Sequence, residues 1–118
     1  LFRFQSSVIR KLAASENCII VGRCADYILE YIPNHLNVYV YAPDEARLKN
    51  CVENLQMDPQ TAKKMMRDVD AARNRYHKAY IPGWQSVFDH KDLMIDSSRF
   101  GIDGTAKILA DIVKNQWG

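Results

Sequence analysis

The sequence has few of the residues from which disulfide frameworks, zinc clusters and phosphate loops are built. Its three cysteines, Cys18, Cys24 and Cys51, include no CxxC pair. An odd number of scattered cysteines argues against a disulfide framework and a zinc cluster, and it favours a reducing, cytoplasmic location. None of the five glycines is followed by lysine. The chain therefore has no GxxxxGK[ST] loop and no visible phosphoryl-transfer centre of its own.

Long apolar runs and a strong overall charge are absent as well. The apolar stretches reach only strand length, far short of the roughly 20 residues that cross a bilayer, so a membrane-spanning protein is excluded. The three histidines lie in separate segments, and no metal site is predicted. A net charge of +2 in 118 residues is too small to indicate nucleic-acid binding. The composition is that of a single globular domain, residues 1–118.

What the chain does contain is an alternation of helical and strand-like segments. Apolar residues at helical spacing predict helices at residues 4–14, 25–31, 59–80 and 103–115, with a further helix opening at Asp44. Continuous or β-branched apolar runs predict strands at residues 18–21, 36–42 and 92–96, and residues 97–101 are expected to form a turn. This order predicts an α/β fold with parallel strands.

Positive charge is concentrated in the predicted helix 59–80. It carries six basic and two acidic side chains, a net charge of +4, whereas the whole chain carries +2. Arg67, Asp70 and Arg73 follow one another at three-residue steps and lie roughly on one side of the helix, where they could hold an anion. A solvated face with local ion pairs is the competing interpretation.

The end of the first predicted strand carries a second candidate site. Ligands of open α/β sheets gather beyond the carboxyl ends of strands, and Gly22 is followed there by Arg23 and Asp26. A guanidinium matches phosphate oxygens, and a carboxylate accepts from the hydroxyl or amino groups of a nucleoside. The alternative is a simple turn in which Arg23 pairs with a neighbouring acid.

Several short motifs in order resemble the cytidylate kinase-like family. They are Cys18–Leu29 (CIIVGRCADYIL), Val38–Pro43 (VYVYAP) with Arg47, Asp70–Arg73 (DAAR) with Tyr76 and Trp84, and Asp92–Ser98 (DLMIDSS) with Gly101–Asp103. The resemblance implies a three-layer, parallel-sheet P-loop fold of the nucleoside monophosphate kinase type. It also implies that the family's first strand and phosphate-binding loop precede this region, so the chain is expected to be incomplete at its N-terminus and inactive alone.

The resemblance also implies roles for individual residues. Arg23 matches the arginine that holds the acceptor nucleotide, with Asp26 as a second substrate contact. Asp70 and Arg73 match the Asp-x-x-Arg of a mobile lid formed by residues 59–80, with roles in acceptor recognition and phosphate neutralisation. Cytidylate kinases carry Asp where this chain has Cys24 and Arg where it has Met66, and Arg67 is the expected replacement for the latter. These departures bear on cytosine specificity more than on phosphate binding.

The function implied is transfer of the γ-phosphate of ATP, with Mg²⁺, to CMP or a related small acceptor. Arg67 and Arg73 would be catalytic, and Ser98 and Arg99 would lie near the ATP adenine. One alternative is a non-catalytic nucleotide-binding or protein-interaction module, and another is a small RNA-binding domain using the basic helix. The expected partner is a nucleotide, with no membrane and no nucleic acid; a homodimer is an open option, and the sequence does not determine the oligomeric state.

Overall fold

The computed structural model describes residues 1–118 as five helices and two strands. In chain order they are α1 (Phe2–Ser15), α2 (Ala25–Ile28), β1 (Val38–Tyr41), α3 (Asp44–Glu53), α4 (Pro59–Tyr80), β2 (Leu93–Asp96) and α5 (Ser97–Trp117). No helix is both long enough and apolar enough to cross a membrane.

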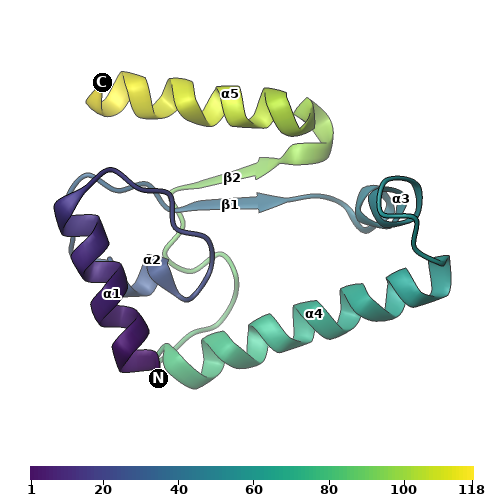
Figure 1. Ribbon diagram of the computed structural model, residues 1–118, viewed down its shortest axis with the longest axis horizontal. Coiled ribbons are helices and arrows are strands. Elements are labelled where there is room, and N and C mark those ends of the chain that lie inside the picture. Colours follow the sequence, from purple (N-terminus) through teal and green to yellow (C-terminus); the bar gives the residue numbers. More distant parts are fainter.

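The two strands form a parallel sheet in which Val38 lies opposite Leu93 and Tyr41 opposite Asp96. Helix α5 packs on this sheet, and α3 lies beyond the carboxyl ends of both strands. From α3, the long helix α4 runs back toward α1 (Figure 1). The parallel α/β prediction is confirmed. The sheet has two strands rather than the expected three, so these residues do not by themselves make the predicted three-layer fold.

The predicted strand at residues 18–21 is wrong. This segment forms no strand, and Ile19 and Val21 are 94% and 87% exposed. An apolar run favours burial, but a strand also needs a neighbour that takes up its backbone N–H and C=O groups. Strand β1 pairs only with β2, and its other edge has no strand partner. Residues 18–21 therefore have the composition of a buried strand but lack the backbone hydrogen bonds to a neighbouring strand.

The helices agree better with prediction. Helix α4 has the expected bounds, because Asp58 caps it by accepting from the backbone N–H groups of Gln60 (3.1 Å) and Thr61 (3.2 Å). Helix α2 is shorter than predicted and ends at Ile28. The turn expected at residues 97–101 is instead helical, but Gly101 (φ 74°, ψ 173°) interrupts α5 with a kink. A positive φ of this size is open to glycine at little cost.

The core is small, and only one of its buried apolar residues, Ile95, lies on the sheet. Ten of the 118 residues are buried, and the one apolar cluster, Ile9, Ile28 and Leu29, joins α1 to α2. The radius of gyration is 16.0 Å, against about 13.5 Å for a compact domain of this length. The fold is therefore open, with long helices spaced around a short sheet (Figure 1).

Candidate functional site

A cavity of about 430 Å³ lies at the carboxyl end of β1, between the strand and α4. Its walls combine aromatic and charged side chains: Tyr39, Val40, Tyr41, Ala42, Arg47, Asp70, Arg73, Asn74, Val87 and Ser97. Asp70, Arg73 and Asn74 share one face of α4, because residues three and four apart lie on the same side of a helix. Two guanidinium groups, from α3 and α4, thus border one cavity where α/β sheets bind their ligands.

The most specific polar contact of the cavity joins Arg47 to Asp70. Arg47 Nη1 donates to Asp70 Oδ2 and Nη2 donates to Oδ1, each at 2.9 Å, and Nη1 also contacts Asp44 Oδ1 at 3.3 Å. The hydrogen bond to Asp70 raises the pKa of the Arg47 guanidinium, so this group keeps its charge at any ordinary pH. The predicted acceptor-recognition residue Asp70 therefore already has a paired partner.

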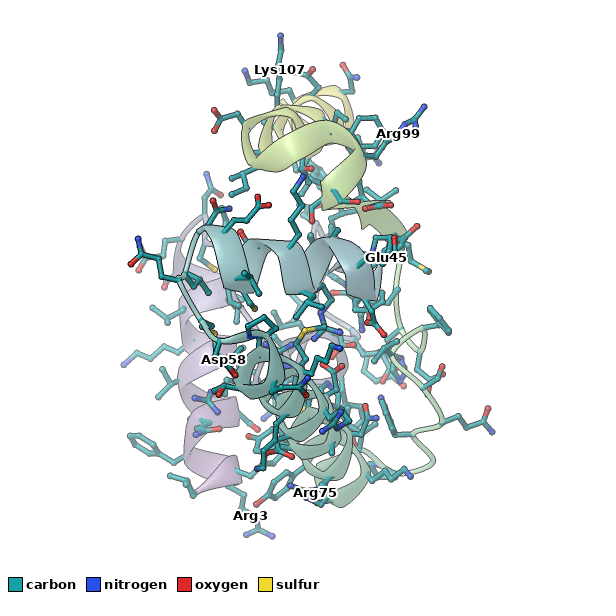
Figure 2. All side chains as sticks on the ribbon, turned by 90° about the vertical axis from the view of Figure 1, so that its right-hand side faces the viewer. Arg3, Glu45, Asp58, Arg75, Arg99 and Lys107 are labelled. Atoms are coloured by element: carbon teal, nitrogen blue, oxygen red, sulfur yellow. The ribbon has the colours of Figure 1, made fainter.

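A second hollow, of about 510 Å³, lies between α3 and the start of α5. Its walls are mostly polar: Glu45, Ala46, Lys49, Asn50, Glu53, Asn54 and Ser98. The start of α5 separates the two hollows, because Ser97 lines the first and Ser98 the second. Lys49 supplies a cation there. Figure 2 shows Glu45 on α3 and, at the start of α5, Arg99 projecting away from the body of the molecule.

Of the two residues predicted to bind the cofactor, Ser98 borders a hollow and Arg99 does not. Ser98 borders the second hollow, and its N–H (2.9 Å) and hydroxyl (2.6 Å) donate to Asp96 Oδ1, which caps α5. These Ser98 hydrogen bonds lower the pKa of the Asp96 carboxyl. Arg99 lines neither hollow. Arg67, the predicted second lid arginine, is exposed on α4 one turn before Asp70 and is likewise outside both walls.

Arg23 lies on an unusual backbone turn. Gly22, Arg23 and Cys24 have φ values of 71°, 59° and 59°, three left-handed residues in succession. The left-handed region costs roughly 1–2 kcal/mol for a residue with a Cβ, and such strain gathers at functional sites. Burial raises the pKa of the Tyr76 phenol on α4, and the nearby Arg23 guanidinium opposes part of that rise.

Asp26 is already engaged by an ion pair with Lys91. Both side chains are largely buried, at 13% and 14% exposed, and the Lys91 ammonium contacts Asp26 Oδ2 directly. The other carboxylate oxygen accepts from the N–H of Tyr27 at 2.9 Å. Asp26 therefore ties the turn that carries Arg23 to the segment before β2.

Two of these contacts could not be located by sequence reasoning. The sequence motif that includes Arg47 gave this residue no role. Its position in the first turn of the helix after β1 was the one local feature that could have placed it near the site. Lys91 gave no signal, because it lies 65 positions from Asp26. The structure gathers Arg47, Asp70 and Arg73 at one cavity, whereas Arg23 and Asp26 lie at the start of α2 and line neither hollow.

Comparison with known proteins gives these residues a family. No curated protein matches the chain. A crystal structure of an uncharacterized protein from Eubacterium ventriosum superposes with a TM-score of 0.86 at 27% sequence identity, covering 97% of this chain. The chain spans 65% of the length of that protein. Residues 1–99 match the cytidylate kinase-like family, and the chain, with its arginines grouped at the carboxyl end of a parallel sheet, belongs to that family.

Proposed function

We propose that this chain forms the acceptor and lid region of a nucleoside monophosphate kinase with a three-layer P-loop fold. The enzyme would transfer the γ-phosphoryl group of ATP to CMP or a related small acceptor. The observation that carries the proposal is the placement of Arg47, Asp70 and Arg73 around one cavity, beside a second polar hollow. Transfer between two nucleotides needs two adjacent sites and cations at their junction.

In this mechanism the chain positions groups and neutralises charge. An oxygen of the acceptor phosphate forms a bond to the γ-phosphorus while the bond from that phosphorus to the β,γ-bridging oxygen breaks, leaving ADP. Arg73 would neutralise the charge that spreads over the transferred group, with Arg67 as the second lid arginine. Arg23 would hold the acceptor phosphate, and Asp26 would keep the Arg23 turn in place.

ATP and Mg²⁺ fit the residues of this chain in part. The second, polar hollow is assigned here to the ATP base: Lys49 and Ser98 border it, and Arg99 follows Ser98 in the sequence. No three His, Cys, Asp or Glu side chains come together as a metal-binding group. Mg²⁺ at nucleotide sites is commonly held by one or two carboxylates, water and the phosphates themselves. When bound, the ion would offset the negative charge of the phosphates.

The decisive test is a coupled kinase assay of the protein as its gene encodes it, with ATP, Mg²⁺ and CMP, dCMP, UMP or AMP as acceptor. We expect turnover with at least one pyrimidine nucleotide. Arg73→Ala should lower kcat/KM by about 100-fold, the size of effect seen when one preorganised transition-state donor is removed. Far-UV circular dichroism should be unchanged.

Arg75→Ala is the matched control, because Arg75 lies on the same helix but outside both hollows. Its kcat/KM should stay within about twofold of wild type. Failure of every acceptor to turn over would defeat the enzymatic proposal. Saturable nucleotide binding without turnover would instead favour the non-catalytic module, and steeply salt-dependent RNA binding would favour use of the basic helix α4.

A further inference from the structure

The contact between Arg47 and Asp70 differs from the other exposed ion pairs of the molecule. It is bidentate, with two nitrogens on two oxygens at 2.9 Å each, so it fixes the orientation of both planar groups. Lys64 and Asp68, on the same helix, make one contact at 2.8 Å with side chains 74% and 64% exposed. Arg47 and Asp70 are 29% and 47% exposed. The Arg47 pair is therefore the more constrained of the two.

The pair joins two elements that are held very differently. Only two residues, Ala42 and Pro43, separate β1 from α3, so Arg47 lies close to the sheet. Helix α4 makes its main contacts with α3 rather than with either strand. It spans 22 residues, of which only Ala62 is buried. Its apolar packing is limited to Ala62 near the start and to Tyr76 and Tyr80, which pack on Phe2 near the end. Little packing therefore holds the turn that carries Asp70 and Arg73.

Asp70 and Arg73 lie one turn apart on the same face of α4, and both border the cavity. Holding the Asp70 carboxylate in a two-point contact fixes the rotation of α4 at that turn. The contact therefore also determines whether the Arg73 guanidinium faces the cavity. Loss of the contact would leave Arg73 on the helix but free to turn away from the cavity.

We propose that Arg47 is a positioning residue that, through its bidentate contact with Asp70, sets the rotation of α4 at which Arg73 faces the substrate cavity. This inference rests on the proposed kinase function for its kinetic consequences. It gives Asp70 a structural role in place of direct acceptor recognition. Because both side chains remain partly exposed, loss of one leaves no buried uncompensated charge, and the protein should fold without this pair.

The test combines Arg47→Ala with the charge exchange Arg47→Asp/Asp70→Arg in the protein as its gene encodes it. Arg47→Ala should lower kcat by about 100-fold, as expected when a reacting group is misplaced by about an ångström, and change the acceptor KM less than about threefold. Adding Arg73→Ala to Arg47→Ala should cost little more, because residues that act as one unit are not additive. The charge exchange should recover kcat to within about fivefold of wild type.

Lys64→Ala is the matched control, since it removes an ion pair from the same helix away from the cavity, and its kcat should match wild type. An Arg47→Ala enzyme within twofold of wild type would overturn the inference. So would a charge exchange as inactive as Arg47→Ala, because that result would mean that Arg47 or Asp70 contacts the substrate itself.

Hydrogen exchange separates failure of this inference from failure of the proposed function. Arg47→Ala should accelerate exchange of the backbone amides at residues 70–74, and the charge exchange should restore their protection. If the wild-type protein transfers no phosphate but shows this pattern, the kinase proposal fails and the positioning of α4 stands. Unaltered exchange in Arg47→Ala would refute the positioning role whatever the activity.

Discussion

Cys24 combines two features that are seldom found together. Its φ of 59° lies in the left-handed region, and its side chain is 1% exposed. Burial, followed by the negative charge of Asp26, raises the pKa of the Cys24 thiol from 9.0 to about 11. The thiol is consequently neutral packing beside Arg23 rather than a nucleophile, since thiolates are the reactive form.

This shift predicts a loss of stability in alkali. Between pH 9 and 11 the folded protein keeps the Cys24 proton while the unfolded chain releases it, so the free energy of unfolding falls as pH rises through that window. The loss attributable to Cys24 is on the order of 2 kcal/mol by pH 11. Urea titrations at pH 8 and pH 11 should show a smaller drop for Cys24→Ala than for wild type.

Cys18 provides the control for that experiment, because it is an exposed free cysteine. Cys18→Ala should leave the alkaline drop in stability unchanged. An identical drop in wild type and Cys24→Ala would show that the Cys24 thiol does not titrate in this window.

At the scale of elements, helix α4 is stabilised mainly by residues at its two ends, because its middle turns bury little apolar surface. Asp58 caps the helix and Pro59 occupies its first turn, where a missing N–H does no harm. At the other end Tyr76 donates a hydrogen bond to Gln5 Oε1 at 3.0 Å, and Tyr80 stacks on Phe2 with ring centroids 4.5 Å apart. The last turns of α4 thus contact α1, and Arg47 supplies the polar contact at the turn that carries Asp70 and Arg73.

We accordingly expect Asp58→Ala to destabilise the protein by about 1 kcal/mol, the usual effect of losing a helix N-cap. Urea unfolding followed by circular dichroism measures the change. Asp58→Asn should be nearly neutral, because an asparagine oxygen accepts the same backbone hydrogen bonds. Equal destabilisation by both substitutions would mean that the carboxylate charge, rather than the cap, supports α4.

At the scale of the whole molecule, the chain exposes much of its surface. Its accessible area is 8987 Å², against about 6,600 Å² for a compact protein of 13.6 kDa. The excess includes large apolar side chains on several elements, among them Phe4, Ile19, Val21 and Ile102. Apolar burial is the main favourable term in folding. Because these 118 residues bury little apolar surface, we expect them to have a small free energy of unfolding by themselves.

Expressed alone, residues 1–118 should therefore bind a hydrophobic dye such as ANS and unfold over a broad range of urea concentration. Small-angle X-ray scattering should give a radius of gyration nearer 16.0 Å than the roughly 13.5 Å of a compact domain. Sharp two-state unfolding together with the smaller radius would contradict the open architecture.

Local patterns located the helices and two strands of this protein, although they missed the first turn of α5 and made α2 too long. Apolar spacing, the Asp58–Pro59 start signal and the Pro82–Gly83 break define α4 because helix formation depends on residues near in sequence. The same patterns predicted parallel strands through the α/β order, and the structure showed that β1 pairs with β2. They also placed Asp70 and Arg73 on one side of a helix, and both line the cavity.

Only the tertiary structure decided which groups meet. Residues 18–21 have a strand-like composition but no ladder partner, and pairing is a property of two segments rather than one. Asp26 finds Lys91 and Asp70 finds Arg47, contacts that span 65 and 23 positions. Ion pairs over such separations depend on how the chain folds back on itself, and no local pattern encodes that distance.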